Sequence, residues 1–214
     1  MLKLVIHSPK GGVGKTTIAT NITLILASQG KKVLALDLAQ GSMMSSYLEG
    51  KRKEQPEKYS AIEIRTEELG ELPTQIKGAR NYDVMVADTD DYYEILNNLV
   101  DPKRRGWRAL APIVPDDAIG LNRIAKELGV VASKQVIASK KFPLKILPNR
   151  CGMTNDIPTD LTIIQNVLEE VGILSLMSQN YLPNAHSSNP PIFIEEDRDF
   201  CQKIENVLSE IGVG

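Results

Sequence analysis

One short stretch near the start of the chain constrains its fold more than any other feature. Residues 8–17 read SPKGGVGKTT and lie between an apolar run at 4–6 and a segment with helical apolar spacing that follows Lys15. Strand, glycine-rich turn and helix in this order form the setting that a phosphate-binding loop requires. The glycines let backbone amides converge on phosphate oxygens, and the helix N-terminus attracts the same negative charge.

The side chains of this loop suit a nucleoside triphosphate and its metal ion. Lys15 supplies a positive charge for the β- and γ-phosphates, and the hydroxyl of Thr16 is a ligand for Mg²⁺. The common pattern G-x-x-x-x-G-K-[ST] is incomplete, because Pro9 stands in the place of its first glycine. The alternative for the same residues is a glycine-rich turn without a ligand.

A second lysine, Lys10, precedes the glycines, and the form KGGVGKTT resembles the deviant Walker A motif of the ParA/MinD family of ATPases. The resemblance implies that ATP is the ligand and that Lys10 reaches the ATP bound by the other subunit of a homodimer. It also implies catalytic roles for Lys10 and Lys15. The ATP contacts that it implies within the loop are Lys10, Gly11, Gly12, Val13, Gly14, Lys15, Thr16 and Thr17.

An acidic residue, Asp37, ends the second apolar run, VLALD at 33–37. Ligands of open α/β sheets bind at the carboxyl ends of strands, so Asp37 is positioned to orient water or to bind Mg²⁺ through water. The alternative is that it caps the next turn. The following residues look like a shortened form of the family's D-x-D-P-Q-G, whose second acid, needed for hydrolysis in the family, falls on Ala39.

The alanine at position 39 bears on turnover more than on binding. Alanine cannot orient an attacking water, and the loss of such a carboxylate costs on the order of a hundredfold in rate. ATP binding does not require it, because the loop is intact. Two interpretations stay open: Asp37 carries the whole acidic role, or the chain holds ATP as a switch without hydrolysing it.

Residues 82–88, YDVMVAD, show the pattern of a Walker B strand. Asp88 matches the family acid that holds Mg²⁺, directly or through water. The prolines that usually follow are replaced by Thr89, Asp90 and Asp91. Together with Asp88, this leaves three acids close to the expected γ-phosphate. These acids either supply the missing function or form a polar turn and cap the next helix.

A further strand is expected at 144–150, ending in Asn149 and Arg150. Family members often carry asparagine here, where its amide reads adenine through a donor and an acceptor together. The resemblance therefore implies that Asn149 and Arg150 contact the nucleotide, and the alternative is that Asn149 begins a turn. The loop at 180–191 corresponds to the family segment that helps cover the base.

Charge limits the contacts that the chain makes with nucleic acid. The formal net charge is −2, so the chain as a whole is not a basic nucleic-acid binder, and any DNA contact has to come from a local patch. In ParA proteins scattered basic residues of the C-terminal half form a nonspecific DNA surface. The corresponding candidates are Lys134, Lys140, Lys141 and Lys145.

Nothing in the sequence indicates a membrane or an export route. We expect no signal peptide and no transmembrane helix, because the chain starts in its first strand and no apolar run approaches 18 residues. The tail at 195–205 is acidic, unlike the cationic membrane helix of MinD-like proteins. Cys151 and Cys201 lack metal-site spacing and indicate reduced thiols in a cytoplasmic protein.

The order of the elements predicts an α/β, doubly wound, mostly parallel sheet of about seven strands with helices on both faces. We expect one domain over 1–214. The last strand is expected at 173–177, the terminal helix at 195–211, and a helix at 93–100. The charged run at 51–58 is expected to be a solvated loop.

Taken with the family resemblance, these features imply a small ParA-type partition ATPase. ATP and Mg²⁺ would bind, the ATP-bound homodimer would hold nonspecific DNA on the nucleoid, and a ParB-like adaptor would stimulate release during plasmid or chromosome segregation. One alternative is positioning of a protein cargo along the nucleoid. Others are an ATP-dependent ligase on the same fold and a binding-only module.

Overall fold

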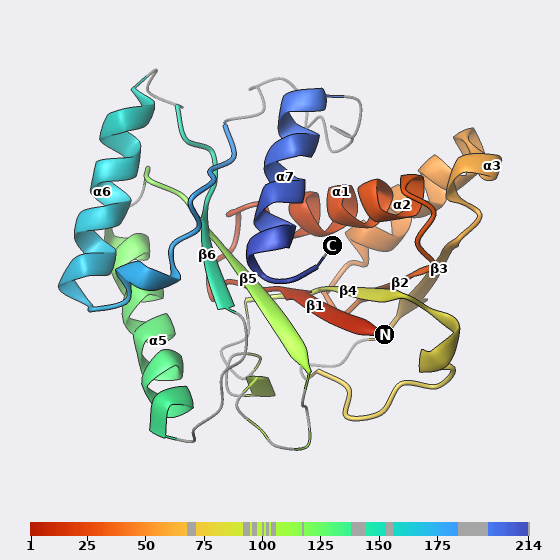
Figure 1. Ribbon diagram of the computed structural model, residues 1–214, viewed down its shortest axis with the longest axis horizontal. Helices are drawn as coiled ribbons and strands as arrows, with labels where there is room; N and C mark the ends of the chain where they lie inside the picture. The colour runs from red at the N-terminus through yellow and green to blue at the C-terminus, as the bar shows by residue number, and fades with distance from the viewer. Residues whose placement is uncertain are drawn as a thin grey trace.

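A sheet of six parallel strands forms the centre of the computed structural model, which describes residues 1–67, 72–91, 95, 98–99, 101, 103, 106–116, 118–137, 144–152, 156–183 and 197–213. Across the sheet the strands run in the order β3-β2-β4-β1-β5-β6 (Figure 1). Their bounds are β1 (Leu2–Ile6), β2 (Val33–Asp37), β3 (Ile62–Thr66), β4 (Val84–Asp88), β5 (Trp107–Ile113) and β6 (Leu144–Pro148). The predicted α/β class with a parallel sheet is confirmed.

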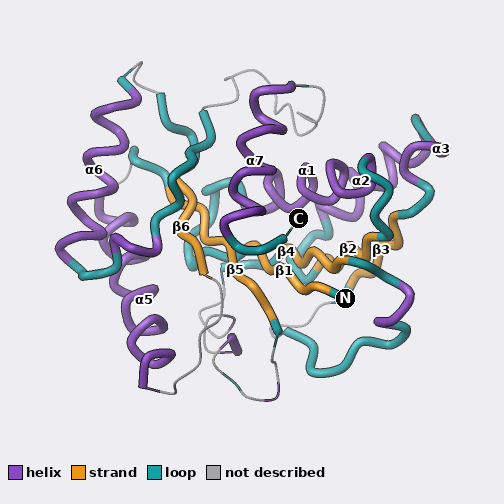
Figure 2. The backbone as a smooth tube through the Cα atoms, viewed as in Figure 1, coloured by secondary structure: helices purple, strands orange, loops and turns teal. Residues whose placement is uncertain are grey.

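Helices cover both faces of this sheet (Figures 1 and 2). One face packs against α1 (Lys15–Ser28), α2 (Met43–Glu54), α3 (Pro56–Tyr59) and α7 (Arg198–Glu210). The other packs against α5 (Ala118–Ile137) and α6 (Ile157–Glu170). Two short 3₁₀ helices, η1 (Ala79–Asn81) and η3 (Leu174–Leu176), lie in connections. No helix in the described part of the chain is long and apolar enough to cross a membrane.

The two cores follow from the alternation of side chains along each strand. In β1, Leu4 and Ile6 join the core beneath α1, whereas Val5 between them joins the core beneath α5 and α6. All three are fully buried. Strands covered on both faces read as continuous apolar runs, which explains why the central strands could be located from sequence.

The expectation of a solvated loop at 51–58 is wrong. Residues up to Glu54 complete α2, and Pro56 occupies the first turn of α3, where its missing amide hydrogen costs nothing. The basic residues in the last turn of α2 stabilise the helix because they lie at the negative end of its dipole. Lys51 also pairs with Glu54 at 3.4 Å. Tyr59 at the end of α3 is fully buried and anchors the segment.

The expected last strand at 173–177 is also wrong. The chain forms η3 there, and only an isolated bridge joins Met177 to Ile146 of β6. The amide of Leu176 donates to the carbonyl of Ile173, which tightens the backbone into a turn. The terminal helix is confirmed as α7, within the predicted range, whereas most of the expected helix at 93–100 lies outside the described residues.

Candidate functional site

The carboxyl ends of three neighbouring strands meet beside the glycine-rich loop. Asp88, the last residue of β4, is in register with Ile6, the last residue of β1, and with Asp37, the last residue of β2. After β1 the chain continues to β2, towards the β3 edge of the sheet, whereas after β4 it continues to β5, towards the β6 edge. The carboxyl ends of β1 and β4 therefore form a topological switch point, where ligands of open α/β sheets bind.

The loop presents backbone donors at this edge. Gly12 and Gly14 have φ angles of 73° and 91°, in the left-handed region that glycine adopts without steric cost. Gly14 is the N-cap of α1 and makes no side-chain cap, and the first turn of α1 holds no acidic residue. The first amides of α1 have no partner within the helix and are available to an anion. The side chain of Val13 is fully buried and anchors the loop.

Lys15 lies at the centre of the loop and is only 8% exposed. Its Nζ donates to the carbonyl of Lys10 at 2.9 Å, so the ammonium is held under the loop. Burial lowers the pKa of Lys15, and the carboxylates of Asp91, Asp88 and Asp90 act in the opposite direction. A cation kept among acids in this way is suited to exchange its backbone contact for phosphate oxygens.

Asp88 is fully buried, and neither of its carboxylate oxygens makes a hydrogen bond within the described part of the chain. Burial raises the pKa of Asp88 to about 7, while the nearby Thr16 hydroxyl and the charge of Lys15 lower it. A buried acid without a partner is costly unless a cation binds it. Asp88 and Thr16 therefore provide a carboxylate and a hydroxyl of the kind that Mg²⁺ prefers.

Asp37 is also fully buried, but its oxygens have partners. They accept from the backbone amides of Ala39 at 3.3 Å and Ser45 at 2.8 Å. The carboxylate thus holds the start of α2 from outside the helix, while Ser42, its N-cap residue, makes no side-chain cap. The geometry establishes this capping contact, and a role for Asp37 towards metal or water stays a prediction.

Asn149 joins the site from the end of β6. Its Nδ2 donates to the carbonyl of Val13 at 2.8 Å, and its side chain is 8% exposed. Arg150 follows in the left-handed region with a φ of 57°. Asn149 therefore lies against the loop, and adenine contact by either residue stays a prediction. The expected base-covering loop at 180–191 falls mostly outside the described residues.

The fit of Asn149 over Gly14 predicts an energetic coupling between them. A Cβ at Gly14 would lie 2.6 Å from the Asn149 amide nitrogen, and the φ of 91° adds backbone strain. We expect Gly14→Ala to cost about 3 kcal/mol of unfolding free energy and Asn149→Ala about 1 kcal/mol. The double variant removes the clash, so its cost is expected to fall below the sum by about 1 kcal/mol.

Gly12→Ala is the matched control for this cycle, measured by urea unfolding. Its φ of 73° is strained in the same way, but nothing lies within 4 Å of the added Cβ. We expect its cost to add to that of Asn149→Ala. Additive costs for Gly14→Ala and Asn149→Ala would show that the contact does not constrain the loop.

His7 is a residue of the site that sequence reasoning missed. It is 1% exposed, and Thr89 Oγ1 lies 2.8 Å from its Nδ1. Because the Thr89 hydroxyl donates to the carbonyl of Ile6 at 3.0 Å, His7 is the donor in their contact. Burial and the charge of Lys15 lower the pKa of His7 to about 3, so the ring is neutral. The contact joins the end of β1 to the residue after Asp88.

Two further acids lie at the mouth of the loop. Asp90 Oδ2 accepts from the backbone amide of Gln40 at 2.7 Å, which ties the segment after β4 to the segment after β2. Asp91 Oδ2 lies 3.8 Å from the position of a Cβ at Gly11. The structure thus brings both acids of the unusual sequence TDD to the phosphate loop.

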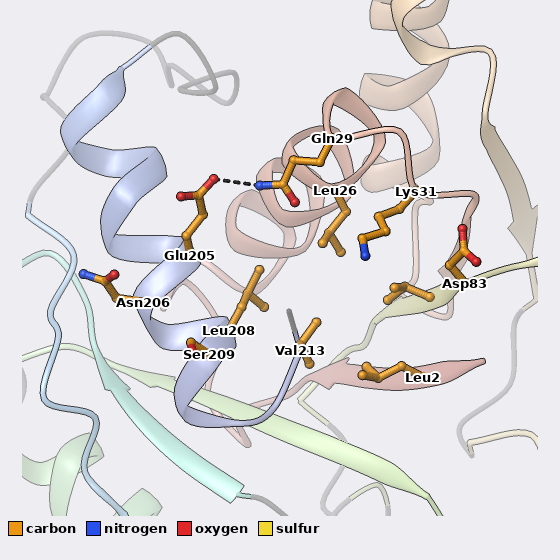
Figure 3. A pocket seen from close by; sticks show the side chains of 11 residues that line it. Leu2, Leu26, Gln29, Lys31, Asp83, Glu205, Asn206, Leu208, Ser209 and Val213 are labelled. Atoms are coloured by element: carbon orange, nitrogen blue, oxygen red, sulfur yellow. Dashed lines mark hydrogen bonds between the residues drawn. The ribbon is translucent and has the colours of Figure 1, made fainter.

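A cavity of about 480 Å³ lies at the opposite end of the sheet (Figure 3). It is lined by Leu2 and Val84, at the amino ends of β1 and β4, and by residues of α1 and α7. Gln29 Nε2 donates to Glu205 Oε1 at 2.7 Å across it. Because these two polar side chains are paired with each other and the loop lies at the other end, the cavity is not part of the candidate site.

Comparison with known families agrees with this geometry. The family model described as the CobQ/CobB/MinD/ParA nucleotide binding domain matches residues 4–192. This range includes the loop, Asp37, Asp88 and Asn149. No curated protein gives a significant sequence match to the chain.

Solved structures with the same fold include three of similar length. Apo McdA from Cyanothece has 17% identity and a TM-score of 0.66, covering 99% of this chain and 100% of its own. The MinD cell division protein from Aquifex aeolicus has 19% identity and a TM-score of 0.64, covering 99% of this chain and 97% of its own. A putative plasmid partition protein from Borrelia burgdorferi, bound to AMPPNP, has 15% identity and a TM-score of 0.62, covering 98% of this chain and 97% of its own. At these identities the likeness establishes the fold.

Proposed function

Since the family match spans residues 4–192, the chain belongs to the CobQ/CobB/MinD/ParA nucleotide-binding domain family, and we propose that it is an ATPase of the partition type. The observation that carries the proposal is the glycine-rich loop with Lys10 and Lys15 beside the buried Asp88, whose carboxylate oxygens make no hydrogen bond within the described part of the chain. In this proposal ATP binds with Mg²⁺, and the ATP-bound homodimer holds nonspecific DNA in the cytoplasm until a ParB-like adaptor triggers release.

Each part of the site has a task in ATP binding. The amides of Gly11 to Thr17 and the ammonium of Lys15 hold the phosphates, and the loop's left-handed glycines preorganise those amides. Thr16 and Asp88 hold Mg²⁺, which when bound neutralises charge on the phosphate oxygens. In the same proposal Asp37 contributes through water, and Asn149 and Arg150 lie towards the base.

Lys10 is the residue through which we propose that two chains associate. Its side chain is half-buried, while its backbone carbonyl is engaged by Lys15. We propose that the Lys10 ammonium contacts the ATP of the partner subunit. A cation supplied in trans couples nucleotide binding to association, because the phosphates become fully neutralised only in the dimer.

The DNA surface of the proposal rests on few described residues. Lys134 lies exposed on α5. Lys145 pairs with Glu210 at 3.6 Å, which leaves it less available to phosphate. Lys140 and Lys141 lie outside the described residues. DNA binding is therefore supported mainly by the family and by the partition proteins that share the fold.

The test is retention of random duplex DNA by the full chain with ATP and Mg²⁺, with ADP, and without nucleotide, with molar mass read in the same run. We expect ATP-dependent dimers that hold DNA and release it as the salt concentration rises. ATP-dependent dimers that ignore DNA would contradict the partition proposal, because it requires a dimer that is bound to DNA.

A second candidate is an ATP-dependent ligase, because the matched family description also includes CobQ and CobB. A ligase requires a carboxylate or amide substrate site beside the γ-phosphate. A protein that stays monomeric and indifferent to DNA in all three conditions would move the proposal to this class.

A further inference from the structure

We infer that Asp91 is a catalytic residue that orients the attacking water for ATP hydrolysis, taking the place of an acid on the segment that follows β2. The inference rests on the proposed function and names a residue for the same site. It starts from the surroundings of the loop. The carboxylates of Asp88, Asp90 and Asp91 lie near Lys15, and that of Asp37 lies near Asp88, but the four differ in the partners that they have.

Three of the four are already engaged or enclosed. Asp37 is buried and accepts from the amides of Ala39 and Ser45. Asp88 is buried beside Thr16 and suits the metal ion. Asp90 is bound to the amide of Gln40. None of the three offers a free carboxylate at the surface of the loop.

Asp91 differs from them in exposure and in position. It is exposed, and it is one of the carboxylates whose charge acts on Lys15. Its Oδ2 lies 3.8 Å from where a Cβ of Gly11 would stand, so the carboxylate faces the mouth of the loop. No side chain intervenes because position 11 is glycine. A carboxylate in this position can hold a water at the mouth of the loop.

Independent observations point to a ligand at this place, beyond the grouping of acids. Asp88 is fully buried with both carboxylate oxygens unpartnered among the described residues, and the Oγ of Ser8 in the loop is likewise buried and unpartnered. The α1 N-terminus has no cap. Together they indicate that a phosphate and a cation complete the site.

In the proposed step the water oxygen forms a bond to the γ-phosphorus, and the bond from that phosphorus to the bridging oxygen breaks, with its electron pair leaving on ADP. One proton of the water stays on the inorganic phosphate, and the other passes through the Asp91 carboxylate to solvent. Orientation and proton acceptance by a positioned carboxylate contribute about 100-fold or more to the rate.

The variant Asp91→Asn separates this role from a structural one. Asparagine caps a helix as well as aspartate does, so any capping of the chain after residue 91 is retained while the charge is lost. We expect phosphate release to fall at least about 100-fold, with ATP affinity equal or tighter because a negative charge beside the triphosphate is removed. Asp91→Glu is expected to recover part of the rate.

One control variant accompanies it. Asp199→Asn makes the same charge change on the exposed surface of α7, far along the chain, and is expected to match wild type. ATP binding is measured for every variant by titration calorimetry.

The possible results distinguish a failure of the inference about Asp91 from a failure of the proposed function. A wild-type rate in Asp91→Asn, with ATP bound, overturns the inference and leaves the proposed function standing. Wild-type protein that binds ATP but releases no phosphate also overturns the inference. Wild-type protein that binds no ATP overturns the proposed function, and the inference with it.

Discussion

Replacing Lys15 with alanine is expected to weaken ATP binding at least about 100-fold, or about 3 kcal/mol. Lys15 is 8% exposed, and its ammonium is held 2.9 Å from the Lys10 carbonyl, where the phosphates are expected. Its loss removes the only side-chain cation buried within the described loop, and the amides alone cannot neutralise a triphosphate. Titration calorimetry with ATP and Mg²⁺ measures the change.

Lys31→Ala is the matched control for this prediction. It removes the same charge beside the cavity at the amino ends of β1 and β4, at the other end of the sheet. We expect it to bind ATP as wild type does. Equal losses in Lys15→Ala and Lys31→Ala would contradict a site at the loop, because only a general effect of net charge would explain both.

Replacing Asp88 with asparagine is expected to stabilise the nucleotide-free protein above neutral pH by about 4 kcal/mol. Burial raises the pKa of Asp88 from 3.8 to about 7. The folded state then holds a proton that the unfolded state has lost, so this acid makes stability fall as the pH rises from 3.8 through about 7. Asparagine has no charge to bury, and its unfolding free energy lacks this dependence.

Urea unfolding between about pH 5 and about pH 8, without nucleotide, measures the effect. The difference between variant and wild type is expected to grow across this range. The same variant is expected to bind ATP no better with Mg²⁺ than without it, since the metal loses its buried carboxylate. Parallel pH profiles for the two proteins would contradict a buried Asp88 whose pKa is raised to about 7.

Much of the fold could be predicted because the strands that build it are short and buried on both faces. Val33 to Asp37 and Val84 to Asp88 read as apolar runs ending in acids, and parallel strands place such ends at one edge. The loop was located by its glycines. The joining of Asp37 and Asp88 in register is the consequence of these local signals.

The parts that sequence could not supply depend on contacts between distant segments. Asn149 reaches the Val13 carbonyl across 136 positions of the chain, and Asp90 reaches Gln40 across 50. No local pattern encodes either distance. His7 carried no motif at all, and only its packing against Thr89 reveals it. The charged run at 51–58 was predicted to be a loop, but its residues belong to α2 and α3, and the buried side chain of Tyr59 holds α3 against the core.

Backbone hydrogen exchange of the full chain, with and without ATP and Mg²⁺, tests most directly whether ATP binds at the loop between β1 and α1, because it locates the ligand without a substitution. We expect slower exchange over residues 11–17 and 88–91, and no change around the cavity beside α7. Unchanged exchange at 11–17, or protection confined to residues 205–213, would contradict it.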